Sequence, residues 1–486
     1  MKILFSHSYF MHFDPKQWEL GQPFPPLGTI LAAAVLREAE HEVFLFDSMF
    51  ANSSEEVIPF FEKMNPQVFV IYDDGFNYLT KMCLTNMREA AFRMQKIAKE
   101  RGCTVIVNSS DSTDHFEKYL DNGADFVIKG EGEMALKDLL HAIGKNESVS
   151  TIEGLVYRKN NVTIQNAKRN VMKELDLLPV AAWDLIEMEK YRSTWISHNG
   201  YFSLNMATTR GCPFKCNWCA KPIYGNRYNS RSPEKVVDEL VMLKEKFNYD
   251  HIWFCDDIFG LTPGWVNRFA ELMAAKKLKL QYKIQSRADL LLQENYVADL
   301  ARSGCETAWM GAESGSQKIL DAMEKGTTID QIREATRLLK RHKIKPAFFL
   351  QFGYPGETID DIQLTIELLN ELLPEDIGIS VSYPLPGTKF YENVKSELIE
   401  KQNWEHSDEL VLMFSNTYSP DFYKQLHKYV HRNYRKHQGY ESLKKIFFSP
   451  QKITRKDFRR AAATFFYIPA VISERKRLKK MEHGRK

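Results

Sequence analysis

The stretch that decides the fold holds three closely spaced cysteines and reads Arg210-Gly211-Cys212-Pro213-Phe214-Lys215-Cys216-Asn217-Trp218-Cys219. It follows an apolar run at 202–208 that has the composition of a buried β-strand. Thiolates spaced C-x3-C-x2-C on one loop can bind three irons of a single iron–sulfur cluster and leave a fourth iron open. A closed zinc site would need a fourth cysteine or histidine in register, and none stands nearby. The spacing therefore favours a cluster over a zinc site or unrelated thiols.

The sequence around this loop repeats a strand-then-helix pattern. Short β-branched or aromatic runs alternate with longer segments whose apolar residues stand three and four positions apart. Strands are expected at 202–208, 251–254, 281–285, 307–310, 347–352 and 377–382. Six parallel β/α units over residues 201–400 predict an α/β module, a partial (β/α)6 barrel like the TIM barrel. In such barrels the chemistry lies on the loops that follow the strands.

A polar motif follows each later strand of this module. The motifs are Phe254-Cys255-Asp256-Asp257, Ser286-Arg287, Gly311-Ala312-Glu313-Ser314-Gly315-Ser316, Gly353-Tyr354-Pro355-Gly356-Glu357-Thr358 and Tyr383-Pro384-Leu385-Pro386-Gly387-Thr388. In the cysteine loop an aromatic residue, Trp218, stands just before the last cysteine. With these features the chain resembles the radical S-adenosylmethionine (SAM) superfamily.

The resemblance implies a 4Fe-4S cluster and SAM as cofactors. In that superfamily SAM chelates the open iron through its amino and carboxylate groups. One electron from the reduced cluster then releases methionine and a 5′-deoxyadenosyl radical, which abstracts hydrogen from a substrate. A flavodoxin or ferredoxin is the reducing partner that this chemistry implies, and the substrate is a small molecule.

The resemblance also implies roles for residues that match the superfamily's motifs. Strand-end acids often only cap the next helix, and a structural ion pair would explain the arginine as well. No residue that contacts the substrate is predicted. The implied metal ligands are Cys212, Cys216 and Cys219, and the implied SAM contacts are Trp218 at the adenine, Asp256 or Asp257 at the ammonium, Arg287 at the carboxylate and Glu313 at the ribose, with Ser286 as a further cofactor-binding residue.

The first 145 residues show a second strand–helix alternation. Strands are expected at 3–5, 43–46, 68–72, 105–107 and 126–128, and helical periodicity covers 27–39, 55–64, 79–99, 115–120 and 134–143. Parallel strands covered by helices on both faces form a doubly wound, Rossmann- or flavodoxin-like domain, which binds ligands beyond the carboxyl ends of its strands. Residues 146–200 are predicted to be a linker with a hairpin at 154–157 and 162–165.

This front domain is similar to the cobalamin-binding domain that precedes many radical SAM modules. The similarity lies in Pro25-Pro26-Leu27-Gly28 and in Gly123-Ala124-Asp125 through Gly130-Glu131-Gly132-Glu133. The subgroup includes cobalamin-dependent methyltransferases and the anaerobic magnesium-protoporphyrin monomethyl ester cyclase. However, the fourth loop reads Asn108-Ser109-Ser110-Asp111 where relatives have a Gly-Gly-Pro-His-like sequence, and a D-x-H-x-x-G motif is absent. Cobalamin binding and a domain that only shapes the substrate cavity both stay open.

Composition sets the remaining bounds. The chain has 486 residues, 44% of them hydrophobic and 27% charged, which is typical of a folded protein with two to four domains. Seven cysteines indicate a reducing, cytoplasmic setting, and Cys83, Cys103, Cys255 and Cys305 are interpreted as structural thiols. The most apolar run, 461–472, contains Pro469 and is shorter than the roughly 20 residues of a spanning helix.

Charge is unevenly distributed along the chain. Residues 421–486 hold 19 lysines and arginines against 5 aspartates and glutamates, whereas the preceding 420 residues hold 47 against 58. Residues 401–486 are therefore predicted to be a basic helical region. A solvated helical cap is favoured, with contact to an anionic membrane surface as the alternative. No nucleic-acid partner is expected.

These observations predict a radical SAM enzyme that modifies a small organic or lipid-like molecule. Methyl transfer is expected if cobalamin binds, and cyclisation, oxidation or rearrangement if it does not. A non-catalytic sensor is a less favoured alternative, because a sensor does not need a complete set of strand-end motifs. A methylthiotransferase would need three further cluster cysteines in the front domain, where only Cys83 and Cys103 occur.

Overall fold

The computed structural model describes residues 1–401, 403–449, 451 and 453–482. Its first sheet has seven strands in the order β2-β1-β3-β4-β5-β6-β7. The first five are parallel, and β6 and β7 form an antiparallel hairpin at the sheet edge. The strands are β1 (Lys2–Ser6), β2 (Glu42–Phe46), β3 (Val68–Tyr72), β4 (Thr104–Asn108), β5 (Phe126–Ile128), β6 (Leu155–Lys159) and β7 (Val162–Gln165). The order 2-1-3-4-5 is that of doubly wound flavodoxin-like folds, as predicted.

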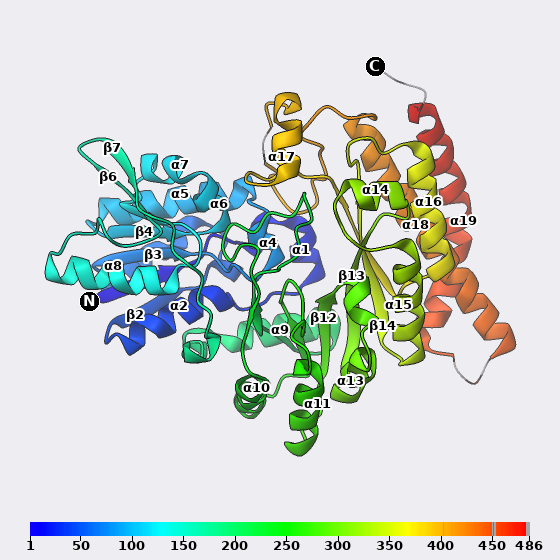
Figure 1. Cartoon of the computed structure of the whole chain (residues 1–486), viewed down its shortest axis with the longest axis horizontal. Helices are drawn as coiled ribbons and strands as arrows, with labels where there is room; N and C mark the ends of the chain where they lie inside the picture. The colour runs from blue at the N-terminus through cyan, green and yellow to red at the C-terminus, as the bar shows by residue number, and fades with distance from the viewer. Residues whose placement is uncertain (402, 450, 452, 483–486) are drawn as a thin grey trace.

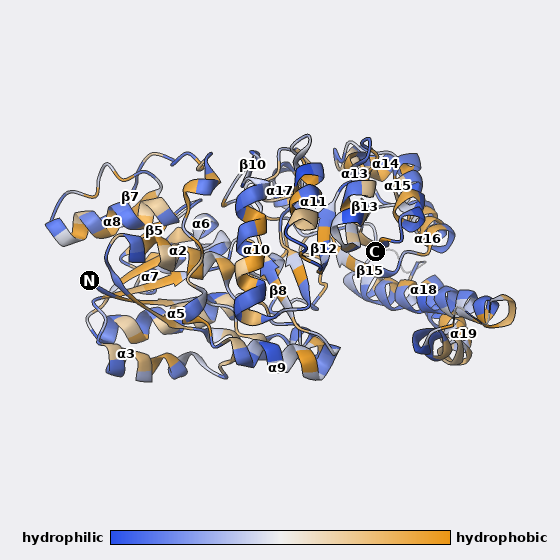
Figure 2. Ribbon diagram, turned by 90° about the horizontal axis from the view of Figure 1, so that it is seen from below, coloured by the Kyte–Doolittle hydropathy of each residue, from blue (hydrophilic) through white to orange (hydrophobic). Residues whose placement is uncertain are grey.

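Helices cover both faces of this sheet because its strands are apolar on both sides. Figure 2 shows α2 (Leu27–Glu38) and α8 (Glu133–Lys145) on one face, and α3 (Ile58–Met64) and α5 (Thr85–Glu100) on the other. Each face has its own buried hydrophobic cluster. The shorter helices of this region are η1 (Met11–Phe13), α1 (Pro15–Leu20), η2 (Ser48–Phe50), η3 (Ser54–Val57), α4 (Tyr78–Lys81), α6 (Ser110–Asp114) and α7 (Phe116–Asp121).

The helix predicted over 79–99 is interrupted. Helix α4 ends at Lys81 and α5 begins at Thr85, with Cys83 at a left-handed φ of 55° between them. Distant residues satisfy the backbone at the break: Asn403 donates its side-chain amide to the Cys83 carbonyl at 2.9 Å, and the Thr85 amide donates to the Trp404 carbonyl at 2.8 Å. Tertiary contacts thus override a continuous helical pattern.

The second sheet has six parallel strands in sequence order, β8-β11-β12-β13-β14-β15, and curls into a half-barrel. The strands are β8 (Ser203–Met206), β11 (His251–Phe254), β12 (Gln281–Ser286), β13 (Cys305–Glu313), β14 (Lys345–Phe352) and β15 (Asp376–Val381). The helices between them are α10 (Pro233–Phe247), α11 (Trp265–Ala275), α12 (Ala288–Leu291), α13 (Tyr296–Ser303), α14 (Gln317–Ala322), α15 (Ile329–Arg341) and α16 (Ile359–Leu372). This confirms the predicted partial barrel.

Side-chain caps show why these helices begin where they do. Ser232 accepts from the Lys235 amide at the start of α10, with Pro233 as the first helical residue. Thr328 and Thr358 form reciprocal capping boxes at α15 and α16. These caps fix the residue at which each helix begins and therefore the length of the loop before it. The motifs at the carboxyl ends of the strands stay at one edge of the sheet.

The remaining elements connect and extend the two sheets. They are η4 (Leu175–Leu177), η5 (Trp183–Leu185), α9 (Met188–Asn199), β9 (Thr209–Arg210), β10 (Asn229–Ser230), α17 (Lys389–Val394), η6 (Lys395–Glu397), α18 (Pro420–Phe448) and α19 (Arg455–Glu482). Helix α18 packs on the barrel, where the Tyr434 hydroxyl donates to the Pro374 carbonyl at 2.8 Å. None of the described helices has the length and apolar character that crossing a membrane requires.

A buried ion cluster joins the two sheets. Arg210, which precedes the cysteine loop, contacts Glu131 and places its Nη2 2.8 Å from Glu133 Oε1; both glutamates belong to the front domain. All three side chains are buried. The guanidinium also lies over the rings of Phe76 and Tyr224. Because a buried charge needs a close counter-charge, this cluster holds the front domain against the cysteine loop.

We expect Arg210→Met to lower the free energy of unfolding by about 3–5 kcal/mol, because it leaves two glutamates buried without a counter-charge. The triple variant Arg210→Met, Glu131→Gln, Glu133→Gln removes all three charges and should recover most of that loss. Urea unfolding of the metal-free protein measures the free energy of unfolding of both variants. A single variant that unfolds at the same urea concentration as the wild type would contradict this role for Arg210.

Candidate active site

A tight turn starts the cysteine loop at Gly211. Its φ is 79°, in the left-handed region, and a Cβ added there would lie 2.4 Å from the Arg227 carbonyl oxygen and 3.1 Å from that of Gly225. Only glycine meets both conditions. The antiparallel pairing of Arg210 with Asn229 closes the base of the loop. The segment from Gly211 to Tyr228 is therefore a closed loop at the carboxyl end of the first barrel strand.

Asn217 anchors the cysteine loop to the barrel. Its backbone amide donates to the Met323 carbonyl at 3.1 Å, and its side chain donates to the Ala322 carbonyl at 2.7 Å. Its side-chain oxygen accepts from the Tyr354 hydroxyl at 3.0 Å. The Phe390 amide donates to the Asn217 carbonyl at 2.9 Å. These contacts come from three segments, the end of α14, the loop after β14 and the start of α17, so the position of the cysteines depends on parts of the chain that lie far apart in sequence.

The three loop thiols suit a cluster better than a single ion. Burial raises the pKa of Cys212, and burial with the nearby Asp257 charge raises the pKa of Cys219 to about 12. Such thiols stay protonated until a cation stabilises the thiolate. Within the described ranges, no three His, Cys, Asp or Glu side chains are placed to share one metal ion. Three separate cysteine donors on one closed loop match the ligand set of an iron–sulfur cluster with an open iron.

Arg287 lies directly beside the cysteines. Its Nη1 is 3.8 Å from Cys216 Sγ, and its guanidinium stacks on the Phe214 ring with 3.7 Å to the centroid. Asp289 pairs with its Nε at 3.0 Å, and the Lys325 carbonyl accepts from its Nη2 at 2.9 Å. The predicted arginine therefore reaches the cysteine loop while a structural ion pair holds it. Ser286, which precedes it, is also buried.

An irregularity at the end of β13 sets the direction of the Glu313 side chain. The strand register shifts between Gly311 and Glu313, and Glu313 has a φ of 58°, which is uncommon for a residue other than glycine. Its carboxylate pairs with Lys325 Nζ at 2.7 Å, and both side chains are buried. Lys325 in turn lies 6.0 Å from the centroid of the Trp218 ring. Glu313 and Trp218 thus share one cation beside the cysteines.

The two adjacent aspartates have different surroundings. Asp256 accepts from the backbone amides of Thr208 and Thr209 at 2.7 Å each, and from the Thr208 hydroxyl at 2.7 Å. Burial raises the pKa of Asp256 to about 6. Its bonds hold the turn between β8 and the cysteine loop. Asp257 instead pairs with Lys81 Nζ of the front domain at 2.7 Å and is partly exposed.

The indole nitrogen of Trp218 is a buried donor without a hydrogen-bond partner in the part of the chain that the structure describes. Buried polar groups in folded proteins are nearly always bonded, so an orphaned donor points to a ligand. Trp218 stands between two cysteines of the loop and beside Lys325. Because of this unpaired N–H, the site fits a further group that carries a hydrogen-bond acceptor.

Four basic residues of this region were not among the sequence predictions. Lys81 and Lys325 are brought to the site by tertiary structure from segments without a motif, so no local signal marks them. Arg210 could have been suspected, because it directly precedes the cysteine motif.

Lys283 lies on β12, and its ammonium is 5.2 Å from the Trp253 ring centroid. Burial lowers the pKa of Lys283 to about 8, and its side chain makes no ion pair with any described residue.

The carboxyl ends of the front strands are filled by the domain's own hydrogen bonds. Asp73 accepts from the Ser8 amide and hydroxyl at 2.7 and 2.8 Å. Asn108 donates to the Ile128 and Gly130 carbonyls at 2.9 Å each. A Cβ at Gly132 would lie 2.9 Å from the Asn108 amide. The side chains at these strand ends are therefore already hydrogen-bonded within the domain, and no step is assigned to cobalamin.

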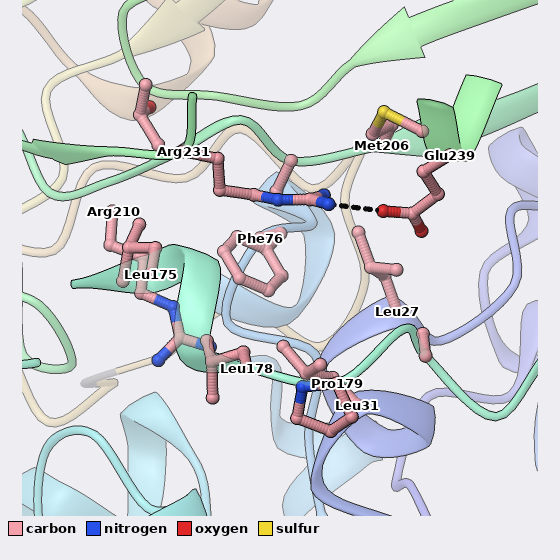
Figure 3. Close-up of a pocket in the computed structure, with 13 residues that line it drawn as sticks. Leu27, Leu31, Phe76, Leu175, Leu178, Pro179, Met206, Arg210, Arg231 and Glu239 are labelled. Carbon is pink, nitrogen blue, oxygen red and sulfur yellow. Dashed lines mark ion pairs between the residues drawn. The ribbon is translucent and has the colours of Figure 1, made fainter. Parts of the chain in front are cut away.

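A pocket lies between the front domain and the barrel, as Figure 3 shows. Its wall is mainly apolar, and its charged side chains are paired: Arg231 lies 2.6 Å from Glu239, and Arg210 belongs to the buried ion cluster. The other labelled lining residues are Leu27, Leu31, Phe76, Leu175, Leu178, Pro179 and Met206.

Comparisons with known proteins agree with this geometry. Residues 206–369 match the Radical SAM superfamily. An uncharacterized methyltransferase of Pyrococcus horikoshii is 27% identical over 392 residues, which cover 79% of this chain and 82% of the relative. The hopanoid C-3 methylase of Methylococcus capsulatus is 26% identical over 427 residues, covering 86% and 78%. The anaerobic magnesium-protoporphyrin IX monomethyl ester cyclase of a Synechocystis strain is 25% identical over 329 residues, covering 66% and 63%.

Two solved structures share the fold. The cobalamin-dependent SAM radical enzyme OxsB with aqua-cobalamin bound has a TM-score of 0.73 and 17% identity, covering 99% of this chain and 76% of that chain. The radical SAM methyltransferase TsrM of Kitasatospora setae, with cobalamin and a [4Fe-4S] cluster bound, has a TM-score of 0.68 and 17% identity, covering 81% and 74%. At these identities the likeness establishes the fold.

The motif, the half-barrel and the family match lead to the same assignment. The predicted resemblance is confirmed, and with it the cofactors that the domain implies, a 4Fe-4S cluster and SAM. Residues 206–369 are a radical SAM domain, and it follows a doubly wound front domain whose fold is shared with the cobalamin-dependent enzyme OxsB.

Proposed function

We propose that this chain uses radical SAM chemistry to methylate a small organic or lipid-like substrate, with cyclisation as the second candidate reaction. The observation that carries the proposal is the closed three-cysteine loop with its ring of buried charged side chains. Two relatives whose names denote methylation, of which one acts on hopanoids, support the first reaction. The magnesium-protoporphyrin cyclase supports the second.

Cys212, Cys216 and Cys219 are the proposed ligands of three irons. When bound, the cluster supplies the electron that splits SAM into methionine and a 5′-deoxyadenosyl radical. The chain itself contributes a loop held by Asn217, in which Cys212 is buried and Cys216 and Cys219 are half-buried. Exclusion of water from such a site strengthens electrostatic contacts and protects reactive species. A flavodoxin or ferredoxin is the proposed electron donor.

The proposed SAM contacts follow from the side chains around the loop. The Trp218 indole donor, which lacks a protein partner among the described residues, is assigned to the adenine. Arg287, beside Cys216, is assigned to the SAM carboxylate together with Ser286. Glu313, held by Lys325, is assigned to the ribose hydroxyls. Charge-assisted bonds of this kind are the stronger ones in protein–ligand contacts.

Asp257 is the better candidate of the aspartate pair for the SAM ammonium. Asp256 already accepts three short hydrogen bonds from the turn before the cysteines, so its proposed part is to position that turn. Asp257 is partly exposed and has one partner, Lys81 of the front domain. A ligand ammonium would therefore compete with Lys81 for this carboxylate, which connects the front domain to the site.

We expect Cys216→Ala to lose the cluster, because two thiolates on this loop cannot replace the third iron ligand. Iron content and visible absorbance after anaerobic reconstitution measure the loss. Cys255→Ala is the matched control, since Cys255 is a buried thiol that lies outside the loop. A cluster retained at wild-type iron content in Cys216→Ala would refute the ligand assignment.

We expect Glu313→Gln to weaken SAM binding by ten- to a hundredfold, the loss that corresponds to a charged hydrogen bond of about 1.5–3 kcal/mol. Equilibrium binding to the reconstituted protein measures this, and iron content should not change. Glu306→Gln is the control on the same strand, because Glu306 pairs with Lys345 at the opposite end of β13. Equal affinity in the two variants would remove Glu313 from the site.

The reconstituted enzyme, reduced with dithionite, should form 5′-deoxyadenosine or S-adenosylhomocysteine from SAM. Chromatography with mass detection measures both products, with and without added cobalamin. Methylation of an added acceptor only with cobalamin would select a cobalamin-dependent methyl transfer, and cobalamin-independent turnover would select the second candidate. Absence of both SAM products in every arm, at full iron content, would contradict the proposed chemistry.

A further inference from the structure

The last two helices form a hairpin that ends in exposed aromatic side chains. Helices α18 and α19 lie side by side, and Figure 2 shows them extending beyond the curled sheet with hydrophobic residues at the tip. Phe447 and Phe448, at the end of α18, are 76% and 84% exposed. Neither is needed for the core of the enzyme, so their exposure requires another explanation.

Helix α19 continues this apolar surface. Phe458, Phe465 and Ile472 stand seven residues apart, which places them on one side of the helix, and Phe465 is 74% exposed. Phe466 and Ile468 are exposed beside them. The face that packs on α18 is a different one and contains Ala461, Thr464, Val471 and Leu478. The helix thus has a buried face and a second apolar face without a partner among the described residues.

The charged residues of α19 also differ between its buried and its exposed face. Two of its three acidic residues, Asp457 and Glu474, are buried and pair with Lys445 and Arg432 of α18, and the third, Glu482, is half-buried at the last position of the helix. The basic residues at both ends of the exposed apolar face point to solvent and make no ion pair with any described residue; they are Arg459, Arg475, Lys476, Lys479 and Lys480. The exposed surface of the hairpin is therefore apolar in the middle and cationic at its ends.

We propose that this hairpin docks on an anionic lipid bilayer, with the phenylalanines in the headgroup–acyl boundary and the basic ends on lipid phosphates. Interfacial helices combine aromatic or aliphatic insertion with lysine and arginine in this manner. A second copy of the chain is a poorer occupant, because facing hairpins would bring like charges together. Nucleic acid is also a poorer occupant, because contact with a phosphate backbone needs basic residues along the whole face, and here they lie only at its ends. The proposal does not depend on the reaction.

Vesicle co-sedimentation of the full chain tests this docking. We expect binding to vesicles of phosphatidylcholine with phosphatidylglycerol, weaker binding at high salt because surface charges are screened, and no binding to phosphatidylcholine alone. Phe465→Ser with Phe466→Ser should weaken binding at least tenfold. Val162→Ser with Leu364→Ser is the matched control, since both residues are exposed and apolar but lie outside the hairpin.

Three outcomes would overturn the proposal. One is the absence of pelleting with anionic vesicles at low salt, when circular dichroism shows a folded chain. Another is equal binding by the hairpin variant and its control. The third is a concentration-dependent dimer in sedimentation velocity that only the hairpin variant loses, because that result would assign the face to a second copy of the chain.

Discussion

The buried pairing of Arg210 with Glu131 and Glu133 is the contact on which the site depends. It connects the residue before the cysteine loop to the loop after the last parallel strand of the front domain. A charge this deeply buried is tolerated only beside its counter-charges, so loss of Arg210 alone would leave two glutamates buried without a partner. A second link, from Lys81 Nζ to Asp257 Oδ1 at 2.7 Å, also joins the front domain to the candidate site.

Much of the architecture could be predicted from local pattern. Alternation of short apolar runs with helical periodicity predicted the five parallel strands of the first sheet and the six of the second, and the cysteine spacing predicted the loop that carries the candidate cluster ligands. The break between α4 and α5 could not be predicted, because it is stabilised by residues 403–404. The same holds for Lys325, which reaches Glu313 only after the chain has returned through α14.

The aspartate pair shows a difference that a sequence motif cannot reveal. Two adjacent acids at a strand end look equivalent in sequence, yet one is enclosed by the turn that it holds and the other faces the front domain. The front domain shows the same limit. Its fold is shared with enzymes whose structures contain cobalamin, whereas its own strand ends, with Asn108 in place of glycine, are filled by internal hydrogen bonds. Fold and ligand are separate properties here.

Low-temperature electron paramagnetic resonance of the reduced, reconstituted chain, recorded with and without SAM, tests the central claim most directly. The claim is that three cysteines leave one iron open and that the buried side chains around them place SAM upon it. The account predicts that SAM changes the g values of the cluster signal. Identical spectra with and without SAM, in protein that carries its full complement of iron, would contradict the account.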